Sequence, residues 1–324
     1  MSGGMTNDMF GCRWSREAEV TMKYVRSPDE RFLDLPDFDF DPHYVEIDST
    51  SGSTLRVCHL EEGRVDGPVV LLLHGEPSWS YLYRHMIPIL VDAGCRVVAP
   101  DLVGFGRSDK PTDPSVFTYE RHVSWLTSHV LGELGLDDIT LVAQDWGGLL
   151  GLRLVAAEPE RFSRVVIANT GLPDGNRPMT DAFLAWQRFA AETEVFPVGR
   201  IVAGGCTTEL SPEVVAAYDA PFHVEEAKAG ARVFPSLVPT SPSDPSAAEN
   251  TLALASLKRF DRPFLTAFSD ADPTSAGGER WFQKHVPGAQ GRHHPTIAGG
   301  GHFLQEDRGP ELAAVVIDFL GTTA

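Results

Sequence analysis

Short apolar runs that alternate with helix-like segments constrain the fold of this chain more than any other feature. Residues 68–73 read Pro-Val-Val-Leu-Leu-Leu, and similar runs recur at 95–100, 139–144 and 163–169. Continuously apolar runs of this length are typical of strands that are covered on both faces. Helical patterns between them, such as 82–93, supply the crossovers that parallel strands need. The sequence therefore predicts an α/β architecture with a mostly parallel, doubly wound sheet of about eight strands.

The segment 170–253 departs from this alternation. It contains helix-like stretches separated by turns rich in Pro and Gly, and no strong strand run. Strand-like runs return at 263–268 and, less clearly, at 294–298. We therefore expect a helical cap (170–253) inserted after the sixth strand of a core domain made of residues 22–169 and 254–324.

Composition narrows the class of protein. The net charge is −18, which argues against nucleic acid or an anionic membrane surface as a partner. No run of about 18 apolar residues is present, so a transmembrane helix is not expected. Residues 1–21 are polar, without periodicity or a secretory pattern, which predicts a flexible N-terminal extension and a cytoplasmic location. The four cysteines lie far apart, so neither a metal site nor a disulfide framework is expected.

A candidate nucleophile stands at a strand-to-helix turn. Residues 141–148 read Leu-Val-Ala-Gln-Asp-Trp-Gly-Gly, and the Asp of this run is Asp145. An α/β-hydrolase places its nucleophile on a sharp turn of this kind. A carboxylate that attacks carbon or phosphorus makes an alkyl or phosphoryl ester, whereas a serine hydroxyl makes an acyl-enzyme. Asp145 therefore indicates hydrolysis through an alkyl or phosphoryl ester of the enzyme and not through an acyl-enzyme.

An acid and a base follow in the chain order that α/β-hydrolases use. His302 comes after three glycines, which let the backbone approach closely, and is the predicted base. The turn after the strand at 263–268 offers two carboxylates, Asp270 and Asp272. We favour Asp272 because it immediately precedes Pro273, and Asp270 stays open as the alternative.

A second turn is expected to stabilise negative charge. The run His-Gly-Glu-Pro at 74–77 follows the third predicted strand. The backbone N–H groups of Glu76 and of Trp146, the residue after the nucleophile, are predicted to form an oxyanion hole. The side chain of Glu76 is expected to be buried near the site, where it would need a partner.

Four segments together resemble the haloalkane dehalogenases, a family of α/β-hydrolases. They are residues 74–84, 101–111, 144–148 and 301–306, and the resemblance extends from about residue 24 to residue 320. His-Gly-x-Pro and Gly-x-Gly-x-Ser alone are shared with epoxide hydrolases. The combination of Asp-Trp-Gly-Gly with His-Gly-Glu-Pro is much more specific and indicates the subgroup that carries His-Gly-Glu-Pro, an acid after the seventh strand and a second tryptophan in the cap.

The resemblance implies a role for each candidate. It makes Asp145 the nucleophile, His302 the base and Asp272 the acid. It also implies that Trp146 binds halide through its indole, and that the second halide-binding indole lies in the cap at Trp186. Phe183 and Phe222 are placed to line the alkyl pocket, although an aromatic residue in a helical cap belongs to the core at least as often.

The expected reaction is hydrolytic dehalogenation of a small halogenated alkane through a covalent alkyl-aspartyl ester. Alcohol, halide and a proton are the products, water is the only co-substrate, and no metal or organic cofactor is implied. We expect a monomer. The alternative is an epoxide hydrolase, whose alkoxide must be protonated, usually by paired cap tyrosines; the predicted cap contains only Tyr218. A non-catalytic role would need a broken triad.

Overall fold

The computed structural model describes residues 22–49 and 52–323. The predicted flexible extension, residues 1–21, lies outside the described residues. A seven-stranded sheet with the order β2-β3-β5-β4-β7-β8-β9 forms the centre of the molecule, and β1 and β6 pair separately. The strands are β1 (Tyr24–Val25), β2 (Pro42–Asp48), β3 (Thr54–Gly63), β4 (Val69–Leu73), β5 (Arg96–Pro100), β6 (Lys110–Pro111), β7 (Ile139–Gln144), β8 (Phe162–Ala168) and β9 (Phe264–Thr266).

The direction of strand pairing changes once across the sheet. β2 pairs with β3, and β3 with β5, in antiparallel fashion. Every further neighbouring pair, from β5 and β4 to β8 and β9, is parallel. All six residues of β7 are buried, as the continuously apolar run at 139–144 predicts for a strand covered on both faces. The prediction of a mostly parallel sheet is confirmed.

The prediction of about eight strands is one too many. The segment 294–298 contributes a single parallel bridge, between Ile297 and Ser269, in place of a strand. His294 explains part of the difference, because its imidazole Nδ1 accepts the hydrogen bond from the Thr266 N–H at 3.0 Å. The His294 side chain thereby bonds a backbone N–H at the outer edge of β9, which would otherwise be free to pair with a further strand.

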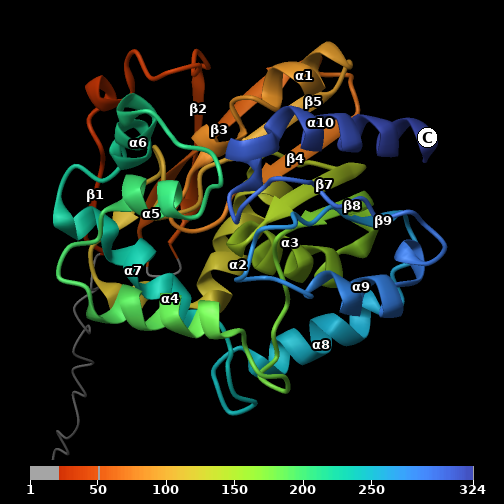
Figure 1. Ribbon diagram of the computed structural model, residues 1–324. Coiled ribbons are helices and arrows are strands. Elements are labelled where there is room, and N and C mark those ends of the chain that lie inside the picture. The colour runs from red at the N-terminus through yellow and green to blue at the C-terminus, as the bar shows by residue number, and fades with distance from the viewer. Residues whose placement is uncertain (1–21, 50–51, 324) are drawn as a thin grey trace, which may run out of the picture.

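Helices cover both faces of the sheet (Figure 1). α2, α3 and α8 pack together on one face, and α1 and α10 pack together on the other. The prediction of a doubly wound sheet is therefore confirmed. The helices are α1 (Ile87–Asp92), α2 (Tyr119–Thr127), α3 (Trp146–Ala157), α4 (Asp181–Glu192), α5 (Val198–Gly204), α6 (Pro212–Asp219), α7 (Ala229–Leu237), α8 (Ala247–Leu257), α9 (Glu279–His285) and α10 (Leu304–Thr322).

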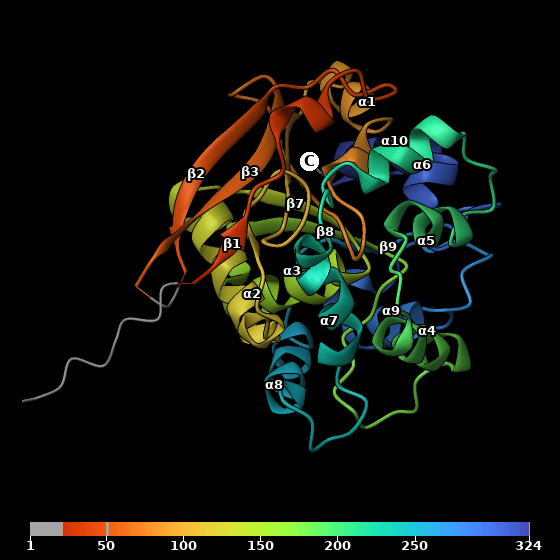
Figure 2. The same cartoon turned by 90° about the vertical axis from the view of Figure 1, so that its left-hand side faces the viewer.

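A long helical segment lies between β8 and β9, the last two strands of the sheet along the chain. β8 is the sixth strand of the large sheet along the chain, and the structure has only helices and loops between it and β9 among the described residues. α4 to α7 gather beside the sheet on one side of the molecule (Figures 1 and 2). α8 instead returns to α3, so the expected boundary at residue 253 falls inside a helix that packs on the core.

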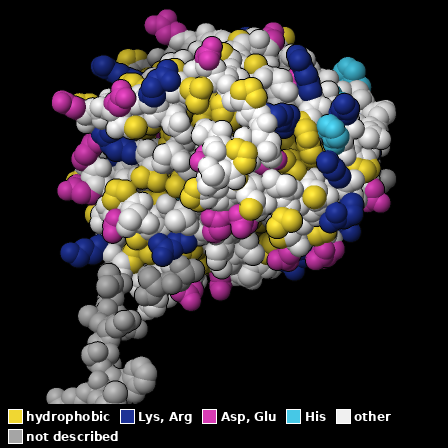
Figure 3. Space-filling model, turned by 90° about the horizontal axis from the view of Figure 1, so that it is seen from below, with side chains coloured by type: hydrophobic (Ala, Val, Ile, Leu, Met, Phe, Trp, Pro, Cys, Tyr) yellow, Lys and Arg dark blue, Asp and Glu magenta, His cyan; other side chains and the backbone are white. Residues whose placement is uncertain are grey.

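On the face seen in Figure 3, acidic and basic side chains do not form separate patches. Acidic, basic and apolar side chains are intermixed there, so that face offers no continuous basic surface for a polyanion. Across the described ranges, no helix is both long and apolar enough to cross a membrane.

Candidate active site

A strained turn presents Asp145 at the end of β7. Asp145 directly precedes α3, and its backbone adopts φ 50° and ψ −128°. Residues other than glycine rarely adopt this conformation. Close backbone approach allows this turn: a Cβ at Gly147 would lie 2.0 Å from the carbonyl oxygen of Leu73. A Cβ at Gly75 would lie 2.3 Å from Asp145 Oδ1. Glycine at both positions therefore makes room for the carboxylate at the edge of the sheet.

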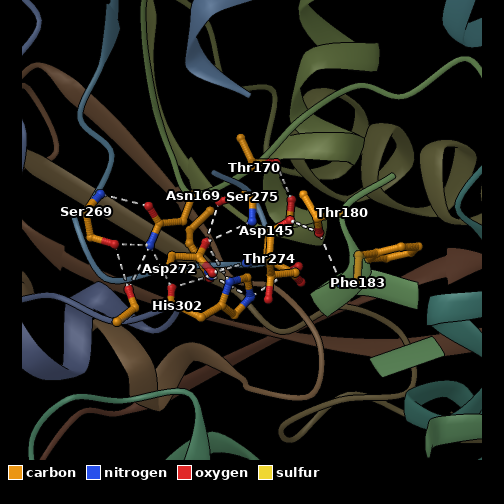
Figure 4. A network of polar contacts seen from close by, with 12 residues as sticks. Asp145, Asn169, Thr170, Thr180, Phe183, Ser269, Asp272, Thr274, Ser275 and His302 are labelled. Atoms are coloured by element: carbon orange, nitrogen blue, oxygen red, sulfur yellow. Dashed lines mark hydrogen bonds and ion pairs between the residues drawn. The ribbon is translucent and has the colours of Figure 1, made fainter. Parts of the chain in front are cut away.

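The structure brings the three predicted catalytic groups into one line, which Figure 4 shows from close by. His302 Nδ1 lies 3.0 Å from Asp272 Oδ2. On the other side of the same ring, His302 Nε2 lies 3.5 Å from Asp145 Oδ2. The imidazole thus stands between two carboxylates that come from different strand ends.

Asp272 is held by donors from its own turn. The N–H of Thr274 donates to its Oδ1 at 2.8 Å, and the Ser275 N–H donates to Oδ2 at 3.3 Å. The Ser275 hydroxyl also donates to Oδ2. Burial alone would raise the pKa of Asp272, but the charge of His302 and these hydrogen bonds outweigh it and lower that pKa to about 2. The carboxyl group is therefore an anion that fixes the orientation of the imidazole.

The alternative acid, Asp270, lies elsewhere. Its side chain is exposed, and its Oδ1 accepts a hydrogen bond from the Gly299 N–H at 2.8 Å. Asp270 therefore bonds the backbone of the glycine-rich turn. Asp272 is the carboxylate that contacts the imidazole of His302.

The charge of His302 depends on both carboxylates. Its burial lowers the pKa, but the charges of Asp272 and Asp145 and the hydrogen bonds to them raise it to about 10. The imidazole is therefore cationic at neutral pH. Loss of the negative charge of Asp145 would lower the pKa of His302, so that more of the imidazole would be neutral and free to accept a proton at neutral pH.

Two amide side chains that the sequence reasoning missed hold the His302 turn in place. Gln144 Nε2 donates to the His302 carbonyl at 3.0 Å. Asn169 Nδ2 donates to the carbonyls of Gly301 and His302 at 2.8 and 3.1 Å, and its Oδ1 accepts from the Ser269 N–H at 2.9 Å. Their position was a usable signal, because each stands at the carboxyl end of a buried strand, where polar side chains converge.

A cavity of about 430 Å³ opens beside the aligned groups. It is lined from the sheet side and from α4 together, and most of its wall is apolar. Trp146 is buried, and its ring packs on Tyr119 and Phe234 at centroid distances of 5.0 and 4.6 Å. The predicted site residues that line the cavity are Glu76, Asp145, Trp146, Phe183, Trp186 and His302. The half-buried carboxylate of Asp145 thus faces a mostly apolar space whose wall includes two indoles.

The chain is similar to known enzymes along most of its length. Residues 68–308 match the family described as alpha/beta hydrolase fold. A haloalkane dehalogenase of Psychrobacter cryohalolentis is 54% identical over 299 residues, which cover 92% of this chain and 98% of that protein. This chain belongs to the haloalkane dehalogenase family. The predicted fold class and family are thereby confirmed.

Further relatives agree with this membership. Haloalkane dehalogenase 1 of Mycobacterium tuberculosis is 47% identical over 304 residues, covering 93% of this chain and all of the relative. The tetrameric haloalkane dehalogenase DpaA from Paraglaciecola agarilytica superposes with a TM-score of 0.82 at 36% identity, covering 91% of this chain and 97% of its own. The similarity therefore spans the sheet and the cap-like helices alike.

In this member of the family, Glu76 contacts the nucleophile and lines the cavity. Its backbone N–H donates to Asp145 Oδ1 at 2.8 Å. Its side chain is 4% exposed and lines the cavity together with the indole of Trp186. The predicted oxyanion donor and the predicted cap indole therefore line the same cavity.

Phe222 lies away from the cavity. It is 6% exposed and packs edge-on against Phe105, with the ring centroids 6.4 Å apart. Phe183 lines the cavity, whereas Phe222 is not among its described lining residues. The expectation that both phenylalanines line the pocket thus needs correction for Phe222, because its ring packs on Phe105 in the loop between β5 and β6.

Thr180, which the sequence reasoning also missed, joins α4 to the turn of Asp272. Its hydroxyl oxygen accepts from the Phe183 N–H at 3.1 Å and caps the helix. The same hydroxyl donates to the Thr274 carbonyl at 2.9 Å. The helix that carries Trp186 is therefore bonded to the loop that holds the candidate acid (Figure 4).

A buried ion pair joins the segment before α1 to the start of α10, and a tyrosine of α6 bonds to it. Arg84 donates to both carboxylate oxygens of Glu306, at 2.7 and 2.6 Å, and the hydroxyl of Tyr218 also donates to Glu306. The only tyrosine of the predicted cap is thus engaged with a carboxylate and is not among the described residues that line the cavity. Within the described ranges, no group of three or more His, Cys, Asp or Glu side chains is arranged to hold a metal ion.

Proposed function

We propose how the residues of this haloalkane dehalogenase divide the work of hydrolysing a carbon–halogen bond. The observation that carries the proposal is the line from Asp145 through His302 to Asp272, which ends at an apolar cavity that two indoles line. Asp145 is the nucleophile, His302 the base and Asp272 the acid that orients it. Trp146 and Trp186 bind the halide.

In the first step Asp145 attacks the carbon that bears the halogen. The Glu76 N–H occupies Oδ1, which leaves Oδ2 as the attacking oxygen. A C–O bond forms, the C–halogen bond breaks, and the halide leaves with the bonding electron pair. The indole N–H groups of Trp146 and Trp186 stabilise the negative charge that develops on the halogen. A halide needs no proton to leave, so this step requires no general acid.

In the second step water cleaves the ester. Esterification removes the negative charge of Asp145, which is one of the causes that raise the pKa of His302. The imidazole then loses its proton more readily and takes a proton from water, and the hydroxide attacks the ester carbonyl carbon. The N–H groups of Glu76 and Trp146 hold the oxyanion, while Asp272 stabilises the imidazolium. Alcohol, halide and a proton are released.

We propose that residues 170–253 act as a cap over a core domain of residues 22–169 and 254–324. α4 supplies Phe183 and Trp186 to a cavity whose other wall comes from the sheet edge. The cap thereby sets the shape of the alkyl pocket while the core carries out the chemistry.

The substrate class follows from the same cavity. Its apolar wall and modest volume fit a small halogenated alkane, with water as the only co-substrate and no cofactor. Epoxide opening is disfavoured, because the alkoxide would need an acid and the Tyr218 hydroxyl already donates to Glu306.

We also propose that the chain works as a cytoplasmic monomer without nucleic acid or membrane partners. A net charge of −18 opposes close association with polyanions and with further copies of the chain. The similar protein from P. agarilytica is described as tetrameric, so light scattering of this chain decides the point. A monomer mass supports the proposal, and a tetramer mass contradicts it.

A substrate panel tests the proposed function. We expect bromide release from 1-bromobutane and 1,2-dibromoethane, and we expect Asp145→Ala to lower the rate by about 10⁴-fold or more. Styrene oxide serves as the rival substrate in the same assay. Turnover of styrene oxide with no halide released from any haloalkane would overturn the dehalogenase assignment.

A further inference from the structure

The turn that carries His302 is held in place by groups outside the turn. Three glycines, residues 299–301, precede the base, and glycine leaves the backbone more conformational freedom than any other residue. The Gly299 N–H donates to Asp270 Oδ1 at 2.8 Å, and the His302 N–H donates to the Gly205 carbonyl at 2.7 Å. The position of the imidazole therefore depends on the groups that accept these bonds.

A buried carboxylate, Asp307, accepts another bond from the same turn. Asp307 lies in the first turn of α10 and is 9% exposed, and its Oδ2 accepts from the Gly301 N–H at 2.8 Å. Gly301 directly precedes the base, so this bond fixes the peptide next to His302. Asp270 is exposed and bonds the turn two residues earlier. Of the two carboxylates, Asp307 is therefore bonded closer to the base.

The same carboxylate holds the connection between α5 and α6. The Thr207 N–H donates to Asp307 Oδ2 at 2.9 Å and to Oδ1 at 3.1 Å, and the Thr208 N–H donates to Oδ1 at 2.8 Å. This connection begins with Gly205, whose carbonyl accepts from the His302 N–H. Asp307 therefore holds both the peptide before the base and the segment that bonds the backbone of the base.

Two further features make Asp307 a strong anchor. α10 is interrupted directly after it, where Arg308 has the non-helical angles φ −144° and ψ 36°, so the helix alone does not fix the first turn. Burial alone would raise the pKa of Asp307, but the N–H groups of Thr207, Gly301 and Thr208 outweigh it and lower that pKa. Asp307 is thus an anion at neutral pH, and hydrogen bonds to a charged acceptor are stronger than those between neutral groups.

We propose that Asp307 is a positioning residue for the base, which keeps the imidazole of His302 between Asp272 and Asp145. Asp307 is not among the described residues of the cavity wall, so it acts through the backbone of the His302 turn. The proposal rests on the role of base proposed above for His302. Only hydrolysis of the ester uses this base, so Asp307 should influence that step and leave carbon–halogen cleavage nearly unchanged.

Single-turnover kinetics with 1-bromobutane, with the enzyme in excess, measures the two steps separately. Bromide reports carbon–halogen cleavage, and 1-butanol reports hydrolysis of the ester. Asp307→Ala removes both acceptor oxygens and should slow 1-butanol formation about 10²-fold, while bromide forms within about threefold of the wild-type rate. Asp307→Asn keeps one of the two oxygens and should slow 1-butanol formation about tenfold. The butyl ester should accumulate in both variants and be visible in the mass of the intact protein.

Asp244 provides the matched control. Its Oδ2 accepts from the N–H groups of Thr240 and Ser241 at 2.8 and 2.9 Å, so it too is a carboxylate that bonds successive backbone N–H groups. Asp244 is not among the described residues of the cavity wall and has no bond to the His302 turn. Asp244→Ala should lower thermal stability to a similar extent and leave the rates of both steps close to wild type.

Proton NMR follows the position of the imidazole independently of rate. The proton between His302 Nδ1 and Asp272 Oδ2 should give a downfield signal in the wild type that is missing in His302→Gln. In Asp307→Ala this signal should broaden or disappear, because a turn that moves exposes the bond to exchange with water. In Asp244→Ala the signal should remain.

Several results would overturn the proposal. Equal slowing of both steps in Asp307→Ala would show a general loss of structure, and the same slowing in Asp244→Ala would show that any such carboxylate matters. Wild-type formation of 1-butanol by a folded Asp307→Ala or Asp307→Asn would also contradict it. Thermal melting shows which variants are folded, and Asp307→Asn decides the question if Asp307→Ala does not fold. The proposed function fails on a separate observation, which is a wild type that releases no bromide from 1-bromobutane.

Discussion

The two walls of the cavity are built in different ways. On the sheet side, Asp145, Asp272 and His302 stand on short turns at strand ends and contact one another directly, at 3.0 and 3.5 Å. On the cap side, Trp186 stands on a helix that reaches the core through side-chain hydrogen bonds, such as the one from Thr180. The sheet side is therefore positioned by backbone geometry, and the cap side by a small number of side-chain contacts.

This difference indicates that the sheet side carries out the chemical steps, whereas the cap side adjusts substrate binding and rate. A group on the sheet side is held by several donors at once, so it serves as a fixed reactant. On the cap side, α4 is bonded to the core through fewer hydrogen bonds, such as the one from Thr180 to the Thr274 carbonyl. We expect substitutions on the sheet side to stop a chemical step, and substitutions on the cap side to change binding and rate by smaller factors.

The largest effect that sharpens this comparison concerns the two aspartates of one turn. Asp272→Asn should lower the rate of ester hydrolysis by about 10⁴-fold, because the amide leaves the imidazolium without its charge partner. Asp270→Asn is the matched control and should stay close to wild type, since Asp270 is exposed and bonds the Gly299 N–H. Pre-steady-state kinetics with 1-bromobutane separates ester hydrolysis from the first step. The reverse pattern would exchange the roles of the two residues.

An intermediate effect is expected for the cap indole. Trp186→Phe removes one N–H donor to the halide and should lower the rate of carbon–halogen cleavage by about 10²-fold, with weaker bromide binding. Trp281→Phe on α9 is the control, because Trp281 stacks on His285 and is not among the described residues of the cavity wall. Bromide release and fluorescence quenching measure the two changes. Equal behaviour of both variants would contradict the assignment of Trp186.

The smallest effect tests the connection between the walls. Thr180→Val removes the cap of α4 together with the hydrogen bond to Thr274, and should destabilise the fold by about 1 kcal/mol. Thr118→Val removes a cap of the same 3.1 Å length from α2, without a bond to the Asp272 turn. We expect similar losses in thermal stability, but a lower rate, by a few-fold, only in Thr180→Val. A rate loss of the same size in Thr118→Val would break the comparison.

The same division explains what the sequence could predict. A continuous apolar run predicts the strand at 139–144, which is buried. Glycines where two backbone segments lie close together mark the turn of Asp145. Local patterns were therefore sufficient to predict both features. The preference for Asp272 over Asp270 also came from local sequence, through the following proline. These features depend on residues that are close in the chain or at adjacent strand ends.

Features that depend on tertiary packing were less accessible. The direction of Phe222, the single bridge at Ile297 and the role of Asn169 each depend on contacts between distant segments. Glu76 illustrates both cases. Its burial was expected from the turn that carries it, whereas its position in one cavity wall with Trp186 depends on how α4 packs over the sheet edge.

The most direct test of the central claim is to trap the ester on Asp145. His302→Gln removes the base while the nucleophile and both indoles remain, so reaction with 1-bromobutane should release about one bromide per protein and then stop. Mass spectrometry of the intact protein and of its peptides should locate one butyl group on Asp145. Release of bromide without an adduct, or a butyl group on another residue, would contradict the account.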